Sequence, residues 1–155
     1  MMGTTHLAIG ALAGLLLFQF FNTNPYLFII LVMVGSLLAD VDHKESKINR
    51  ILPVTRWIPY FFRHRGFFHS IFPAVIILVA LYSAGQITIA IPLTIGYLSH
   101  LFSDCFTRQG CNLLHPISTF RIQGFLHTGG IVEFAILGFV LLLDVVILAR
   151  YAGLI

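Results

Sequence analysis

Charged residues are scarce in this sequence. Asp, Glu, Lys and Arg make up only 10% of the 155 residues, whereas a soluble domain carries about 25%. Hydrophobic residues reach 58%, above the roughly 45–50% of soluble domains. The net charge of +3 comes from too few basic residues to form a phosphate-binding stripe, so nucleic acid is not expected as a partner. We therefore predict a single membrane domain over residues 1–155.

Cysteine is also scarce. Cys105 and Cys111 are too few for a disulfide framework and form no CxxC motif, so we expect small buried or interfacial side chains. No Lys or Arg precedes the first apolar run, and no small-residue cleavage site is evident. That run is therefore expected to remain as a membrane span and not to be removed as a signal peptide.

Long apolar runs dominate what remains. A helix needs about 20 residues to cross the hydrocarbon core of a bilayer. The second run reaches that length only if Asp40 and Asp42 are included, and the fourth only with His100 and Asp104. These polar groups are thus expected at headgroup depth. The sequence predicts an all-α, polytopic membrane helix bundle with about five transmembrane helices, near residues 3–21, 24–42, 67–84, 87–106 and 131–150.

Basic residues fall almost entirely on one side of this topology. Five spans place the N-terminus and the 43–66 and 107–130 loops together. Eight basic residues then lie on that side and only Arg150 on the other. Because Lys and Arg are enriched in cytoplasmic loops, we predict a multi-pass protein of the inner (plasma) membrane, with its N-terminus and these loops in the cytoplasm.

The seven histidines gather on the same side, together with every acidic residue except Asp144. Ionisable groups at membrane depth are costly and usually face the protein interior, where they are paired or functional. His100 and Asp104 are four residues apart, so they share one face of a helix. Histidine and carboxylate are ligands of zinc and similar divalent ions, and the candidates exceed what one ion needs. An internal His100–Asp104 hydrogen bond is the plain alternative.

Five segments that contain histidines or acidic residues occur in a characteristic order. They are His6-x3-Gly10, Leu38-Ala39-Asp40-Val41-Asp42-His43, His64-Arg65-Gly66-x2-His69-Ser70, Gly96-Tyr97-Leu98-Ser99-His100-x3-Asp104-x2-Thr107-x2-Gly110 and Gly130-x2-Glu133. In this order the sequence resembles the YdjM-like family of predicted membrane-bound metal-dependent hydrolases. The similarity covers nearly the whole chain, and its HRGxxHS and GYLSHxxxD blocks are specific. The family is distantly similar to zinc-dependent phospholipases C.

The resemblance implies a hydrolase that attacks a phosphoester, a phospholipid or lipid-linked phosphate, with a metal-activated water. Zn²⁺ is the expected ion, two or more ions are plausible, and Mn²⁺ and Mg²⁺ are alternatives. Catalytic roles are expected for Asp40, Asp42 and Arg65, whose guanidinium suits a phosphate. The roles of His43, His115 and His127 stay open. The implied metal ligands are His6, Asp40, Asp42, His64, His69, His100, Asp104 and Glu133.

Two other classes of function fit part of the pattern. Histidines and acids at the ends of a bundle also serve divalent-cation or proton-coupled transporters. Such a path should leave polar groups through the membrane midplane, where Gln19 and Asp144 are the main exceptions to an apolar pattern. The third class is a structural or regulatory membrane subunit that only binds metal.

Overall fold

The computed structural model describes residues 1–43, 46, 49, 55, 57, 60 and 65–154, and it is all-α as predicted. Short 3₁₀ turns extend or precede several helices. The isolated bridges Thr107–Leu126 and Cys111–Ile122 pair backbone segments within the loop of residues 106–130. The described ranges form the helices α1 (Gly3–Leu17), α2 (Pro25–Leu38), α5 (Ile71–Ser83), α6 (Ile87–Cys105) and α7 (Ile131–Tyr151), with the 3₁₀ turns η1 (Phe18–Phe20), η2 (Ala39–Asp42) and η4 (Phe67–His69).

Short turns connect α1 to α2 and α5 to α6, at the ends of these helices opposite η2 and η4. Asn24 caps α2: its Oδ1 accepts hydrogen bonds from the N–H groups of Tyr26 (3.0 Å) and Leu27 (3.2 Å). Pro25 follows at the first helical position, where its missing N–H costs nothing. Between α5 and α6, Gly85 adopts a φ of 73°, which only glycine adopts readily.

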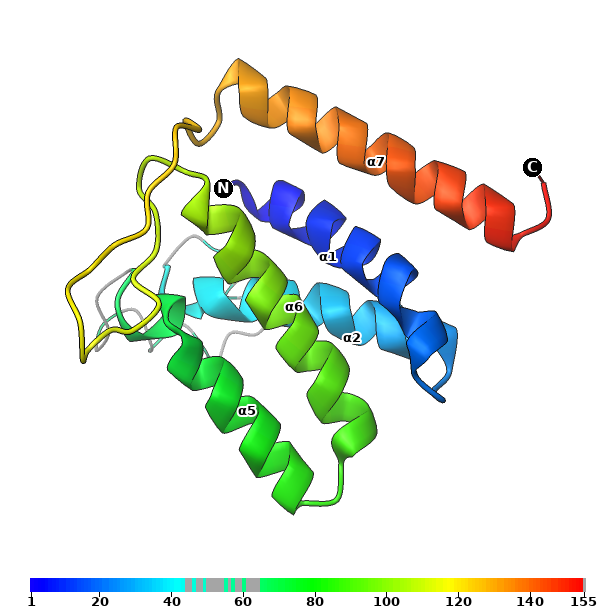
Figure 1. Ribbon diagram of the computed structural model, residues 1–155, viewed down its shortest axis with the longest axis horizontal. Coiled ribbons are helices and arrows are strands. Elements are labelled where there is room, and N and C mark those ends of the chain that lie inside the picture. The colour runs from blue at the N-terminus through cyan, green and yellow to red at the C-terminus, as the bar shows by residue number, and fades with distance from the viewer. Residues whose placement is uncertain are drawn as a thin grey trace.

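Helix α2 lies between α1 and α6, and α6 also packs on α5 (Figure 1). Helix α7 lies beside α1, with which it makes its main helix contacts. The helices fan out from the end that carries the 106–130 loop. That end collects the N-terminus of α1, η2 at the end of α2, η4 before α5, and the C-terminus of α6.

The backbones of α2 and α6 touch at two glycines. A Cβ added to Gly35 would lie 2.2 Å from the carbonyl oxygen of Leu93, and one added to Gly96 would lie 2.0 Å from that of Val32. Small residues permit this approach in membrane helix pairs, where dispersion contacts drive association. The crossing positions His100, one turn beyond Gly96, against the backbone of α2.

Three helical segments in the described part of the chain are long and apolar enough to cross a membrane: Gly3–Phe20, Pro25–Asp42 and Ile131–Tyr151. The structure does not support the predicted count of five. Helix α5 has only 13 residues, about 20 Å at 1.5 Å per residue, because residues 67–69 form the turn η4 instead of its first turn. Helix α6 has 19 residues but falls below the hydropathy of a span, since hydroxyl residues and its His–Asp pair interrupt it.

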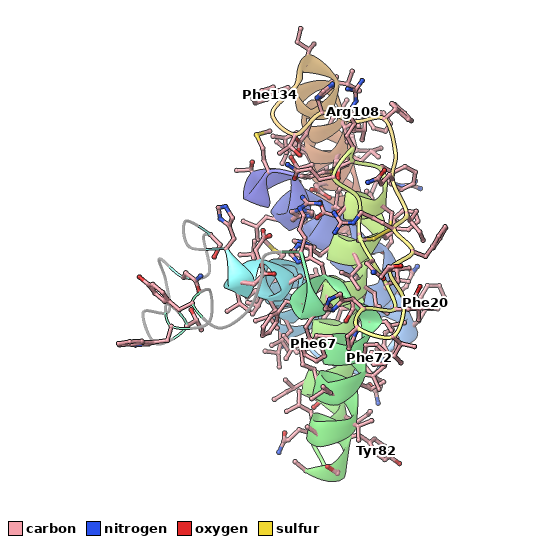
Figure 2. All side chains as sticks on the ribbon, turned by 90° about the vertical axis from the view of Figure 1, so that its left-hand side faces the viewer. Phe20, Phe67, Phe72, Tyr82, Arg108 and Phe134 are labelled. Atoms are coloured by element: carbon pink, nitrogen blue, oxygen red, sulfur yellow. A yellow bond between two sulfur atoms is a disulfide. The ribbon has the colours of Figure 1, made fainter. Side chains whose placement is uncertain are left out.

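Large apolar side chains cover the outside of the helices. Figure 2 shows Phe20, Tyr82 and Phe134 at the periphery, and they are 73%, 66% and 57% exposed. An apolar exterior of this extent would be unfavourable in water and matches lipid contact. Buried polar residues, in contrast, concentrate at the end that holds η2 and η4.

The glycine crossing gives a direct test of this packing. Gly96→Ala places a methyl group against the α2 backbone, so we expect a loss of about 1–3 kcal/mol in stability and a lower Tm by intrinsic fluorescence in detergent. Gly138→Ala on α7 is the control, because no atom lies within 4 Å of its added Cβ and alanine favours helix. An unchanged Tm for Gly96→Ala would contradict the close crossing.

Candidate metal centre

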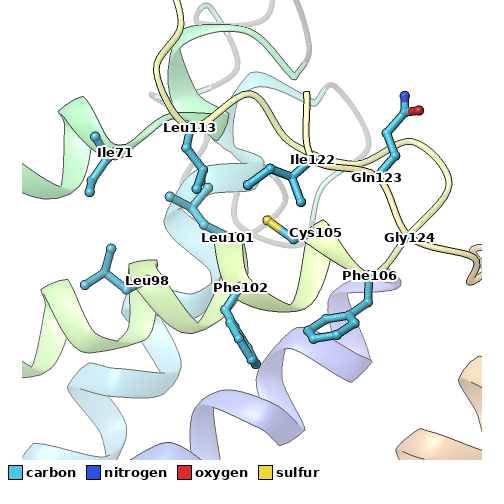
Figure 3. Close-up of a pocket in the computed structure, with 10 residues that line it drawn as sticks. All are labelled: Ile71, Leu98, Leu101, Phe102, Cys105, Phe106, Leu113, Ile122, Gln123 and Gly124. Carbon is cyan, nitrogen blue, oxygen red and sulfur yellow. The ribbon is translucent and has the colours of Figure 1, made fainter. Parts of the chain in front are cut away.

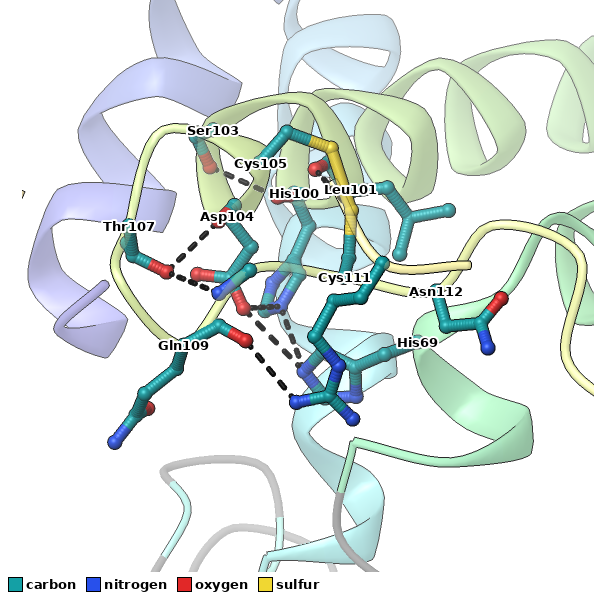
Figure 4. The surroundings of a disulfide bond; sticks show 12 residues. His69, His100, Leu101, Ser103, Asp104, Cys105, Thr107, Gln109, Cys111 and Asn112 are labelled. Carbon is teal, nitrogen blue, oxygen red and sulfur yellow. Dashed lines mark hydrogen bonds and ion pairs between the residues drawn. A yellow bond between two sulfur atoms is a disulfide. The ribbon is translucent and has the colours of Figure 1, made fainter. Parts of the chain in front are cut away.

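Four separate elements bring imidazoles and carboxylates to one end of the bundle. Helix α1 supplies His6, η2 supplies Asp40, η4 supplies His69, and α6 supplies His100 and Asp104. Figure 4 shows His69, His100 and Asp104 converging from η4 and α6. All of these side chains except Asp40 are at most 1% exposed, whereas Asp40 is 19% exposed. The cluster is therefore buried, with its most open side at Asp40.

Four of these side chains form a compact quartet. His69 Nε2 lies 3.4 Å from His100 Nε2, 3.8 Å from Asp40 Oδ1 and 3.6 Å from Asp104 Oδ2. His100 Nε2 lies 3.8 Å from both of those carboxylate oxygens. Tetrahedral ligands about 2.0–2.1 Å from a zinc ion are about 3.3–3.5 Å apart. Five of the six distances within the quartet are therefore close to those of a tetrahedral site, while Asp40 and Asp104 fall into different three-residue groups of potential ligands.

In His69 and His100, Nε2 faces the other members of the quartet and Nδ1 faces away from them. The partner of Nδ1 determines whether Nε2 has a lone pair. His100 Nδ1 is 2.8 Å from the carbonyl oxygen of Ser36, which can only accept, so Nδ1 carries the proton and Nε2 the lone pair. His69 Nδ1 lies 3.4 Å from Asp42 Oδ2, and a carboxylate there favours the same tautomer. A backbone carbonyl or carboxylate behind the ring is the usual arrangement for a metal-binding histidine.

His6 extends the cluster on the α1 side. Its ring stacks on His100 with centroids 3.7 Å apart, and its Nε2 lies 3.4 Å from Asp104 Oδ1. Ser103 Oγ donates to the His100 carbonyl at 2.9 Å, which leaves its oxygen to accept from His6 Nδ1–H at 2.9 Å. His6 Nε2 then carries a lone pair and faces Asp104 Oδ1. A buried imidazole nitrogen beside a carboxylate fits a bound cation.

Asp104 joins two overlapping groups of potential ligands. One group is His6, His100 and Asp104, and the other is Asp40, His69 and His100. Asp104 turns Oδ1 toward His6 and Oδ2 toward His69 and His100. The two groups share His100, whose single Nε2 lone pair can serve only one ion at a time.

Two cationic groups already contact Asp104. The ammonium group of Met1 meets Oδ1, and Arg65 Nη2 lies 3.1 Å from Oδ2. Arg65 is fixed at both ends: its backbone N–H donates to Asp42 Oδ2 at 3.0 Å, and Nη1 donates to the Gly110 carbonyl at 2.8 Å. Its φ of 60° is uncommon for a residue with a side chain. This strained position aims both the backbone N–H and the guanidinium at the cluster.

The structure places the other predicted ligands outside these two groups. Asp42 is buried behind His69 and Arg65. Glu133 is buried in the first turn of α7, where Oε1 accepts from the Met2 N–H at 2.6 Å and Oε2 from the Gly129 N–H at 2.7 Å. His64 lies outside the described residues. Among described residues, neither group includes His43, His115 or His127.

Sequence reasoning missed the groups that orient the histidines. Ser103 follows His100 by three residues, so both lie on one side of α6. This spacing could have indicated that Ser103 also faces the cluster, where its hydroxyl contacts His6. Ser36 acts through its carbonyl oxygen, a backbone group for which no sequence pattern exists.

Cys105 and Cys111 are half-buried and buried, as predicted, but they also form a disulfide that the sequence analysis did not predict (Figure 4). The chain turns back after α6: Thr107 Oγ1 donates to the Asp104 carbonyl at 2.8 Å, and Gly110 adopts a φ of 61°. The two cysteine Cα atoms are thereby 5.4 Å apart. The closed loop also presents the Gly110 carbonyl to Arg65.

Comparison with known proteins matches these features to one family. The family model described as "YdjM inner membrane protein" matches residues 1–154. The chain is 32% identical over 125 residues to "Uncharacterized protein YvsG" of Bacillus subtilis, which covers 79% of this chain and 78% of that protein. It is 34% identical over 87 residues to "Inner membrane protein YdjM" of Escherichia coli, which covers 52% of this chain and 44% of that protein.

No solved structure matches the chain. The family match spans nearly all of the residues and includes each element that supplies the histidines and carboxylates described above. The chain belongs to the YdjM family of inner membrane proteins.

Proposed function

We propose that this protein is a metal-dependent hydrolase of phosphoesters embedded in the inner membrane. The observation that supports this most strongly is the quartet of Asp40, His69, His100 and Asp104, in which each histidine Nε2 lies 3.4–3.8 Å from the other histidine and from both carboxylates. Buried histidines whose second ring nitrogen faces a carbonyl or carboxylate suit metal chemistry better than a purely structural polar core.

The quartet would hold a divalent ion, with Zn²⁺ favoured by its mixed imidazole and carboxylate ligands. His6 and Asp104 would be available to a second ion, but His100 would not, because its one Nε2 lone pair would serve the first. When bound, such ions supply Lewis-acid chemistry: they polarise a phosphoryl oxygen and make water a better nucleophile at neutral pH. The protein's own part is to hold the ligands in place, through the Ser36 carbonyl, Ser103 and Asp42.

Asp40 and Arg65 are the side chains available to the substrate. Asp40 is the most exposed of the quartet, so a water molecule on its open side could be oriented by the carboxylate. The Arg65 guanidinium, next to Asp104, is always charged and can donate to two phosphate oxygens. Fixing a water and a phosphate next to each other is the positioning that hydrolysis requires.

We infer further that all five helices take part in the membrane fold and that the centre faces the cytoplasm at headgroup depth. Helices α5 and α6 would end near the lipid headgroups, which explains their shorter or less apolar spans. Three described arginines lie at the end of the bundle that holds the centre: Arg65, Arg108 and Arg121. Arg150 lies at the opposite end, in the last turn of α7. This distribution supports the orientation by the positive-inside rule.

Metal content tests the centre independently of any substrate. Purified wild-type protein, measured by inductively coupled plasma mass spectrometry, should hold at least one tightly bound divalent ion per chain. His100→Ala should lose it, because His100 belongs to both groups of ligands. Ser99→Ala is the matched control, since its hydroxyl bonds only within α6. Metal-free wild type, or equal metal in the His100 variant, would refute the centre.

Hydrolysis tests the proposed activity. Protein loaded with zinc or manganese should release product from a phospholipid, a lipid phosphate or a generic phosphodiester. Arg65→Ala should lower kcat/KM by about 10²–10³, the usual effect of removing a donor to transition-state charge. The exposed Arg108→Ala is the control and should keep its activity. If the loaded protein cleaves none of these substrates but moves ions across proteoliposomes, a transporter replaces the hydrolase.

A further inference from the structure

An apolar groove of about 340 Å³ runs between α1, α6 and α7 near the candidate metal centre. The walls are lined by Ile9 of α1, Phe102 of α6, Phe106 directly after α6, and Val132 and Ile136 of α7. Figure 3 shows Phe102 and Phe106 pointing from α6 toward the α1 side, away from Leu113. We call this space the α1–α7 groove.

The inner end of the α1–α7 groove lies next to the metal centre, separated from it by Met1 and Ser103. Met1 and Ser103 line the groove, and each contacts a residue of the centre: Met1 meets Asp104, and Ser103 Oγ lies 2.9 Å from His6 Nδ1. The groove is thus apolar along its length and leads to a buried polar cluster at one end. A molecule with a hydrocarbon tail and an anionic head has the same distribution of polarity.

Two of the helices that line the groove are candidate membrane spans. Helices α1 and α7 both belong to segments that are long and apolar enough to span a bilayer. Helix α7 packs mainly on α1, and the groove walls are open: Phe102 is 66% exposed and Val132 is 54% exposed. Lipid chains in the bilayer can therefore enter sideways, without first passing through water.

We propose that the α1–α7 groove binds an acyl chain of a glycerophospholipid while the headgroup phosphate of that lipid lies at the metal centre. This assignment rests on the proposed hydrolase and specifies its substrate class. It makes Ile9, Val132 and Ile136 determinants of chain recognition, and it gives α7, which supplies neither group of ligands in the described structure, a role in binding.

A larger cavity on the other side of α6 argues for this choice by contrast. It has a volume of about 610 Å³ and is lined by Ile71, Leu98 and Leu101 among others. Phe102 and Phe106 line both spaces, and their edge-to-face pair, with centroids 5.1 Å apart, separates them. In the described chain, no ligand of either group lines the larger cavity or the groove, but Met1 and Ser103, which contact Asp104 and His6, line only the groove. The larger cavity therefore provides a matched control.

Photocrosslinking tests the groove directly. The full-length protein in nanodiscs is mixed with a phosphatidic acid that carries a diazirine on one acyl chain, and labelled peptides are identified by mass spectrometry. We expect labels concentrated on residues of α1 and α7 that line the groove. Ile136→Trp should fill the groove and reduce this labelling about tenfold, whereas Leu98→Trp in the larger cavity should not. Uniform labelling of all lipid-facing helices, or no effect of Ile136→Trp, would overturn the assignment.

Parallel assays separate this inference from the proposed function. Ile136→Trp should lower hydrolysis of phosphatidic acid about tenfold and leave hydrolysis of water-soluble p-nitrophenyl phosphate unchanged. If the wild type labels in the groove but cleaves neither substrate, the lipid site stands and the hydrolase fails. If it cleaves both and Ile136→Trp affects neither, the groove fails and the hydrolase stands. Unchanged metal content shows that the variant folds; Val132→Phe replaces it if it does not.

Discussion

The contact between the α2 and α6 backbones is the constraint on which the centre depends. Gly35 and Gly96 allow the two helices to approach until carbonyl oxygens would meet any added Cβ. Only at this separation can His100 Nδ1 reach the carbonyl of Ser36, at 2.8 Å. That bond fixes the ring and its tautomer, and through the stacked His6 ring it also sets the second group of ligands. The close packing of α2 against α6 thus determines the geometry of a site one helical turn away.

Burial explains why the cluster needs cations. Asp42 and Asp104 are at most 2% exposed, and isolated carboxylates in such surroundings cost several kcal/mol each. Arg65 and the Met1 ammonium offset part of the charge at Asp104. The histidines add no positive charge if they remain in the tautomers that their outer partners favour. A divalent ion in the quartet would complete the compensation, so metal binding would stabilise the fold.

Sequence reasoning predicted the class of the protein and the location of its centre. Apolar runs ending in His or Asp predicted that His6, Asp40, His69, His100 and Asp104 would meet at one end, and the described structure brings them together. The sequence pattern could not reveal that residues 67–69 form a 3₁₀ turn, because the apolar run Phe67–Phe68 is also compatible with the first turn of an α-helix. It also could not show that Glu133 would find two backbone N–H donors, since those donors belong to Met2 and the turn at Gly129.

Glu133 connects the two parts of the molecule. Helices α1, α2, α5 and α6 share extensive contacts, whereas α7 rests chiefly on α1. A buried carboxylate that accepts from the N–H groups of both Met2 and Gly129 anchors the start of α7 to the start of α1, and hydrogen bonds to a charged acceptor are among the stronger ones in proteins. The anchor fixes the width of the α1–α7 groove at its inner end, where Met1 separates it from Asp104. Glu133 therefore holds α7 in place beside the proposed lipid site, without being a ligand in the described centre.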